Sequence, residues 1–66
     1  MIDGEKIRSL RNALDKTTAE VAYSVGVSES MMRQIELEIK RPSVENLKRI
    51  ADLLGVTVDD LYKETA

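Results

Sequence analysis

The connection formed by Gly26, Val27 and Ser28 constrains the fold most, because it is all that separates two short helical patterns. Upstream, residues 17–20 read Thr-Thr-Ala-Glu, a T-x-x-E capping box that predicts the start of a helix. Gly26 stands where a left-handed residue would end that helix, and Ser28 is the N-cap of the next. A connection this short makes two helices cross steeply and leaves the outer face of the second in solvent.

Four residues around this connection have steric reasons for their identity. Ala22 is small where the two helices would cross most closely, and Gly26 can adopt a positive φ at little cost. Met32 and Ile35 have the spacing of an inner face on the following helix. We therefore expect these four residues to hold the helix-turn-helix together.

The rest of the chain predicts three more helices and no strand. The first covers about residues 4–15. Another follows Pro42 with Ser43 as its cap, and a short fifth runs from a Thr57 cap to about residue 63. The expected inner-face residues are Ile7, Leu10, Leu14, Val21, Val25, Leu47, Ile50, Ala51 and Leu54, with Ile39 added if the helix after Ser28 runs past Glu36. We expect an all-α fold of five short helices in a single domain over residues 1–66.

Composition excludes several functional classes. The chain has 66 residues, of which 42% are hydrophobic, and contains neither Cys nor His. Disulfides, thiolate zinc sites and His-activated nucleophiles are therefore excluded, and we expect neither an enzyme nor a cofactor nor a small-molecule ligand. No apolar run approaches the roughly 18 residues of a membrane span, and the N-terminus has no signal pattern. These features predict a cytoplasmic protein.

Taken in order, these features resemble the Cro/repressor-type helix-turn-helix family, also called the XRE family. The resemblance extends from Gly4 to Leu61 and rests on residues 4–8, 17–22, 26–30, 34–36, 42–43, 47–51 and 59–61. It implies a lambda-repressor-like fold whose third helix enters the major groove of double-stranded DNA, often as a homodimer. The implied function is sequence-specific regulation of transcription, and we expect a small repressor that occludes an operator.

Carried over by position, the resemblance implies a DNA-facing surface of Thr18, Glu29, Ser30, Met31, Arg33 and Gln34, to which the basic residues Lys40 and Arg41 add. Gln34 can pair with adenine, and Ser30 can bind a base edge or a phosphate. Met31 fits either a thymine methyl or the core, whereas Met32 fits the core. For Arg33, Lys40 and Arg41, a phosphate contact and an ordinary solvated charge are equally compatible with the sequence.

A further family feature is an ion pair between the first and third helices, for which Arg11 and Glu36 occupy the positions. The interpretation here is structural, since a partly buried pair would orient the third helix more than stabilise it. Neither residue is expected to contact a base.

Three departures from the family affect the details of DNA contact. Thr18 replaces the usual Gln, and Glu29 would repel phosphate although it could accept from cytosine N4. After Glu36 the family reaches Gly within two residues, whereas this chain continues Leu37-Glu38-Ile39, which predicts a longer third helix. Together with the net charge of −2, these features leave an alternative: a protein-binding helical module that keeps the fold without DNA affinity.

Towards the C-terminus, more apolar residues are present than the fourth helix needs for its inner face. They are Leu53, Val56, Val58, Leu61 and Tyr62. They either close the core or form a two-fold dimer interface, as family members often do in this region.

Overall fold

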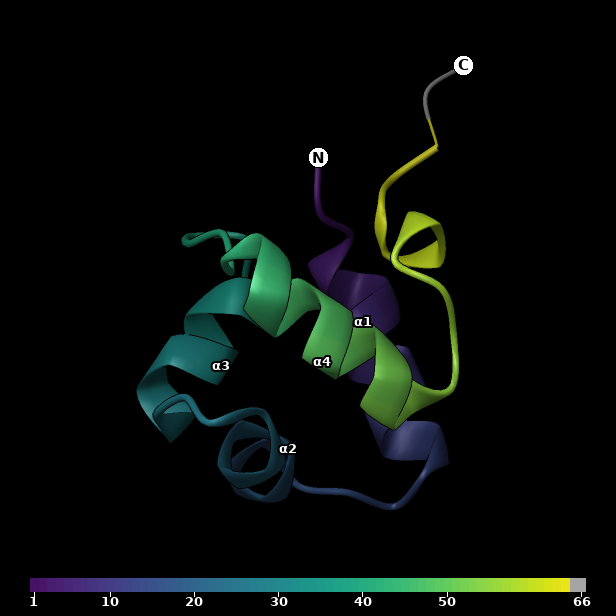
Figure 1. Ribbon diagram of the computed structural model, residues 1–66. Helices are drawn as coiled ribbons and strands as arrows, with labels where there is room; N and C mark the ends of the chain where they lie inside the picture. Colours follow the sequence, from purple (N-terminus) through teal and green to yellow (C-terminus); the bar gives the residue numbers. More distant parts are fainter. Residues whose placement is uncertain (65–66) are drawn as a thin grey trace.

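The computed structural model describes residues 1–64, which form four α-helices and one short 3-10 helix without a strand (Figure 1). The elements are α1 (Gly4–Ala13), α2 (Thr18–Val25), α3 (Glu29–Glu36), α4 (Val44–Leu54) and the 3-10 helix η1 (Asp59–Leu61). Helix α2 contacts both α3 and α4, and α1 packs against α3, α4 and η1. The helices therefore surround one core, and the predicted all-α class is confirmed.

The predicted capping residues begin the helices where the sequence places them. The Thr17 hydroxyl accepts from the Glu20 N–H at 3.0 Å, while the Glu20 carboxylate accepts from the Thr17 N–H at 2.9 Å. Ser28 and Ser43 each accept a backbone N–H three residues ahead, at 3.0 and 3.1 Å. Because each hydroxyl accepts from a helical N–H that has no partner within its own helix, the caps fix where α2, α3 and α4 start.

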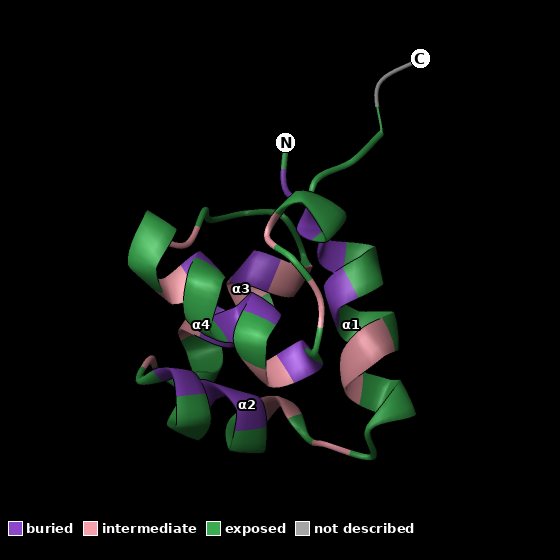
Figure 2. Cartoon of the chain, turned by 45° about the vertical axis from the view of Figure 1, so that its right-hand side comes forward, coloured by how far each residue is buried: buried purple, intermediate pink, exposed green. Residues whose placement is uncertain are grey.

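The core consists of aliphatic side chains that the helices turn toward one another, seen as the purple segments at the centre of Figure 2. Its buried members are Ile2, Ile7, Val21, Ala22, Val25, Met32, Ile35, Leu47, Ile50, Ala51, Leu54 and Leu61. The predicted inner faces of α2 and α4 are confirmed. Leu14 is not part of the core: α1 ends at Ala13, so Leu14 lies past its end and is 45% exposed.

The prediction of a fifth α-helix to about residue 63 is wrong. The Thr57 hydroxyl and the Asp60 carboxylate exchange hydrogen bonds with each other's backbone N–H, but only the turn η1 follows. At its last residue, the Leu61 carbonyl accepts from the Asp3 N–H at 2.8 Å, and two residues later the Lys63 N–H donates to the Met1 carbonyl at 2.8 Å. These groups are paired with the N-terminal segment, so they cannot continue a helix.

The prediction that α3 runs past Glu36 is also wrong. Leu37 is its C-cap, and Glu38 adopts a φ of 63°, the left-handed conformation that ends a helix. The helix therefore ends at a left-handed residue that is not a glycine. As a result Ile39 leaves the helix and is 68% exposed, rather than lying on the inner face.

Candidate nucleic-acid interface

The joint between α2 and α3 is a tight left-handed turn. Gly26 has a φ of 90°, and its N–H and that of Val27 both donate to the Ala22 carbonyl, at 2.9 and 3.0 Å. Ala22 itself is 2% exposed between the packed helices. Ser28, the N-cap of α3, follows this turn with only Val27 between it and Gly26. Because the connection is so short, the end of α2 sets the direction of α3.

Helix α3 is anchored by one face and presents the other. Met32 and Ile35 are completely buried, whereas Glu29, Ser30 and Arg33 are exposed. Met31 and Gln34 lie between these faces and are half-buried. One side of the Met31 side chain packs against the core, and the rest of it remains accessible to solvent.

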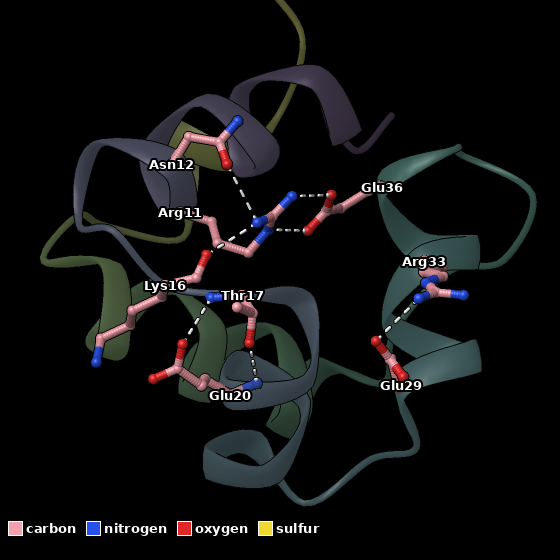
Figure 3. Close-up of polar contacts among 8 residues, drawn as sticks. All are labelled: Arg11, Asn12, Lys16, Thr17, Glu20, Glu29, Arg33 and Glu36. Atoms are coloured by element: carbon pink, nitrogen blue, oxygen red, sulfur yellow. Dashed lines mark hydrogen bonds and ion pairs between the residues drawn. The ribbon is translucent and has the colours of Figure 1, made fainter.

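Two hydrogen-bonded pairs lie along the exposed side of α3. Arg33 forms an ion pair with Glu29 at 3.0 Å (Figure 3), and the Gln34 side-chain amide donates to the Ser30 hydroxyl at 3.2 Å. Both pairs link residues four apart, which are neighbours on a helix surface. The Glu29 carboxylate is therefore partly neutralised by a cation of its own helix.

An ion pair fixes α3 against α1. The Arg11 guanidinium donates to both carboxylate oxygens of Glu36, from Nε at 2.8 Å and from Nη2 at 3.1 Å (Figure 3). The two side chains are only 12% and 6% exposed. The hydrogen bond with Glu36 raises the pKa of Arg11 above its ordinary value. Because the contact is bidentate and largely buried, it specifies the orientation of the last turn of α3.

The remaining residues expected at the DNA lie outside α3. Lys40 and Arg41 are exposed in the loop between α3 and α4. Thr18 is the first residue of α2 and is half-buried. The backbone N–H groups of that first turn point out of the helix end, where the helix dipole is positive.

Comparison with known proteins decides the family. The sequence profile of the helix-turn-helix family HTH_3 matches residues 7–61. The chain belongs to this family. A curated relative, the cryptic phage CTXphi transcriptional repressor RstR of Vibrio cholerae, is 35% identical over 57 residues, which cover 86% of this chain and 51% of that protein. The chain thus spans about half the length of that relative.

Solved structures of helix-turn-helix repressors have the same fold. The P22 c2 repressor in complex with a synthetic operator superposes with a TM-score of 0.89 at 33% identity, covering 96% of both chains. The N-terminal DNA-binding domain of SinR from Bacillus subtilis has a TM-score of 0.83 at 28% identity, covering 94% of this chain and 91% of that one. The chain is thus a repressor-like helix-turn-helix domain of the Cro/XRE type.

The C-terminal apolar residues of this helix-turn-helix domain divide into two groups. Leu61 is completely buried, so it closes the core and is not available to a second copy. Leu53, Val56 and Val58 are half-buried, and Tyr62 is 38% exposed. Of these five residues, the last four therefore offer apolar surface outside the core.

One contact of the helix-turn-helix domain escaped the sequence analysis. The Glu38 carboxylate accepts from the Gly4 N–H at 3.0 Å and from the Lys63 ammonium at 2.6 Å. The hydrogen bond with Lys63 lowers the pKa of Glu38 and raises that of Lys63. Nothing in the spacing of residues 34 and 25 apart signals this contact, which joins the turn after α3 to both ends of the domain.

Within residues 1–64, no three acidic side chains come together in a way that could hold a metal ion. None of the helices described is long and apolar enough to cross a membrane.

Proposed function

We propose that this chain binds double-stranded DNA sequence-specifically and represses transcription by occupying an operator. The observation that carries the proposal is the exposed polar face of α3, held outward by the buried Met32 and Ile35 on its other side. An α-helix of about 10 Å diameter fits a major groove about 12 Å wide. The family and the fold are those of DNA-binding transcriptional regulators, which are not enzymes. This role places the chain in the compartment that holds the DNA, the cytoplasm expected from its sequence.

Base contacts are assigned to the exposed and half-buried residues of α3. Gln34 carries both a donor and an acceptor, the pattern that pairs with adenine N7 and N6. Met31 offers an apolar surface to a thymine methyl, and Ser30 lies beside Gln34. Glu29 and Arg33 bind each other across the same face, and both lie near the groove when α3 is docked.

Phosphate contacts are assigned to the borders of that face. Lys40 and Arg41 follow α3 closely and are exposed, so their charges can reach a DNA strand. At the start of α2, the backbone N–H groups near Thr18 and the helix dipole favour an anion. The overall charge of −2 does not oppose this arrangement, because phosphate responds to the local potential.

The same proposal includes a homodimer. Leu53, Val56, Val58 and Tyr62 supply an apolar surface that a two-fold related copy would cover. Such a dimer would set two recognition helices about 34 Å apart, one turn of DNA. Sedimentation at tens of micromolar tests it: a dimer supports the assignment, and a persistent monomer overturns it.

A salt titration of binding to labelled duplex tests the DNA-binding role. Affinity should fall with a log–log slope of about −0.9 for each phosphate neutralised. Lys40→Ala and Arg41→Ala should each make the slope shallower by about one phosphate, whereas the control Lys48→Ala, on α4, should leave it unchanged. Absence of binding to any duplex at low salt overturns the proposal. That result would favour a protein-binding module, for which the exposed Leu37 and Ile39 are the supporting observation.

Selection of bound duplexes from a random pool tests the assignment of bases. Gln34→Ala should relax the preference at one position of each half-site, at a cost of about 1–3 kcal/mol. An unchanged preference in this variant would contradict the placement of Gln34 in the groove.

A further inference from the structure

The hydrogen bond between Ser30 and Gln34 determines which groups of Gln34 are free. The Gln34 Nε2 donates to the Ser30 Oγ at 3.2 Å, with Ser30 exposed and Gln34 half-buried. A side-chain amide has two N–H donors and one oxygen acceptor. With one N–H given to Ser30, a single N–H and the Oε1 remain for a partner.

This remaining pattern of one donor and one acceptor distinguishes purines. In the major groove, adenine offers an acceptor at N7 and a donor at N6, whereas guanine offers acceptors at N7 and O6. An amide with one free N–H and a free oxygen matches adenine at both positions. It matches guanine at only one, because its second donor is already engaged by Ser30.

We propose that Ser30 is a positioning residue that sets base specificity through Gln34, favouring adenine over guanine. This inference rests on the proposed DNA-binding function. Ser30 need not touch a base, because its hydroxyl acts by holding the Gln34 amide in one orientation before DNA arrives. A glutamine that is free to rotate loses side-chain entropy when it binds a base. Because Ser30 already restrains Gln34 in the free protein, part of this entropy is lost before DNA binds.

The neighbouring ion pair engages a side chain that could otherwise bind guanine. Arginine is the commonest side chain to bind guanine O6 and N7 in the major groove. Here the Arg33 guanidinium is bound to Glu29 at 3.0 Å (Figure 3). Both residues precede the Ser30–Gln34 pair by one position in the sequence. A guanine contact by Arg33 would have to compete with this ion pair.

Selection from a random duplex pool tests the inference with three variants beside the wild type. Ser30→Ala removes the hydroxyl from an exposed helical position and so leaves the fold intact. Ser30→Thr restores a hydroxyl, and Ser9→Ala removes one from the exposed side of α1 as a control. Base preference, affinity for random duplex and thermal midpoint are measured for each.

The expected result is specific to one base. Ser30→Ala should lower the adenine-over-guanine preference at the Gln34 position about 3- to 10-fold, the equivalent of one net hydrogen bond. The loss should fall on sites that carry adenine at this position rather than equally on all duplexes. The thermal midpoint should not fall, because Ser30 is exposed and alanine favours a helix at least as well as serine. Ser30→Thr should recover the preference, and Ser9→Ala should match the wild type.

Several outcomes would overturn the inference. An unchanged preference in Ser30→Ala, or a wild type that selects no adenine there, removes the role of the hydroxyl. A uniform loss of affinity for all duplexes would assign Ser30 to a phosphate instead. Failure of the wild type to bind any duplex is a different result, since it overturns the proposed function together with this inference.

Discussion

Gly4 lies against the last turn of α3, the helix proposed to read the DNA bases, and substitution of Gly4 by alanine tests that contact. A Cβ on Gly4 would lie 2.2 Å from the Glu36 carbonyl oxygen, 2.7 Å from the Glu36 carbonyl carbon and 2.8 Å from the Ile35 carbonyl oxygen. All three are backbone atoms of α3, so no side chain can rotate away. Ordinary contact begins near 3.4 Å, so the start of α1 and the end of α3 must separate by about 1.2 Å.

The magnitude follows from three effects. Overpacking of this kind costs about 1–3 kcal/mol, and displacement weakens the hydrogen bond from the Gly4 N–H to Glu38, worth about 1 kcal/mol. The higher helix propensity of alanine relative to glycine offsets up to about 1 kcal/mol of this loss. The net loss is about 2 kcal/mol, which lowers the thermal midpoint of so small a domain by about 8–16 °C.

Thermal unfolding followed by far-ultraviolet circular dichroism measures the effect. The sign is decisive, because Gly→Ala in an open helix would stabilise the fold. Ser9→Ala, at an exposed position of the same helix, is the control and should change the midpoint little. A Gly4→Ala midpoint equal to or above that of the wild type would refute the close approach of α1 to α3.

Three further predictions concern polar contacts. Glu36→Gln should lower the free energy of unfolding in urea by about 3 kcal/mol, because it leaves the largely buried Arg11 charge without its counter-ion. A loss below about 1 kcal/mol would contradict the importance of this ion pair. Thr17→Ala should cost about 1 kcal/mol in the same assay by removing half of the capping box, and no change would show the cap to be dispensable. The lowered pKa of Glu38 stabilises the fold above its ordinary value of about 4.5, and this stabilisation is lost as pH falls through the folded pKa. Midpoints measured from pH 7 to about pH 3 should therefore fall less steeply in Glu38→Gln than in the wild type, and parallel curves would argue against the Lys63 contact.

Helix starts and inner faces could be predicted from the sequence because they depend on neighbours within one or two turns. The Thr17 box, the Ser28 and Ser43 caps and the left-handed Gly26 each involve groups at most four residues apart. The inner faces follow in the same way from helical periodicity, which local spacing records.

The ends of two helices could not be predicted, because they depend on distant backbone groups. Thr57 and Asp60 are a sound local start signal, but no helix continues because Leu61 and Lys63 pair with Asp3 and Met1. The turn after α3 follows the same principle. Glu38 adopts a positive φ, and its carboxylate accepts hydrogen bonds from the Gly4 N–H and from the Lys63 ammonium.

The sequence by itself therefore determined the helix-turn-helix and the buried side of its third helix, since those features arise from contacts close along the chain. Only the tertiary structure decided where α3 ends and which groups hold that end in place. Those features depend on which groups the fold brings within bonding distance, and residues 34 apart leave no periodic trace of such a contact.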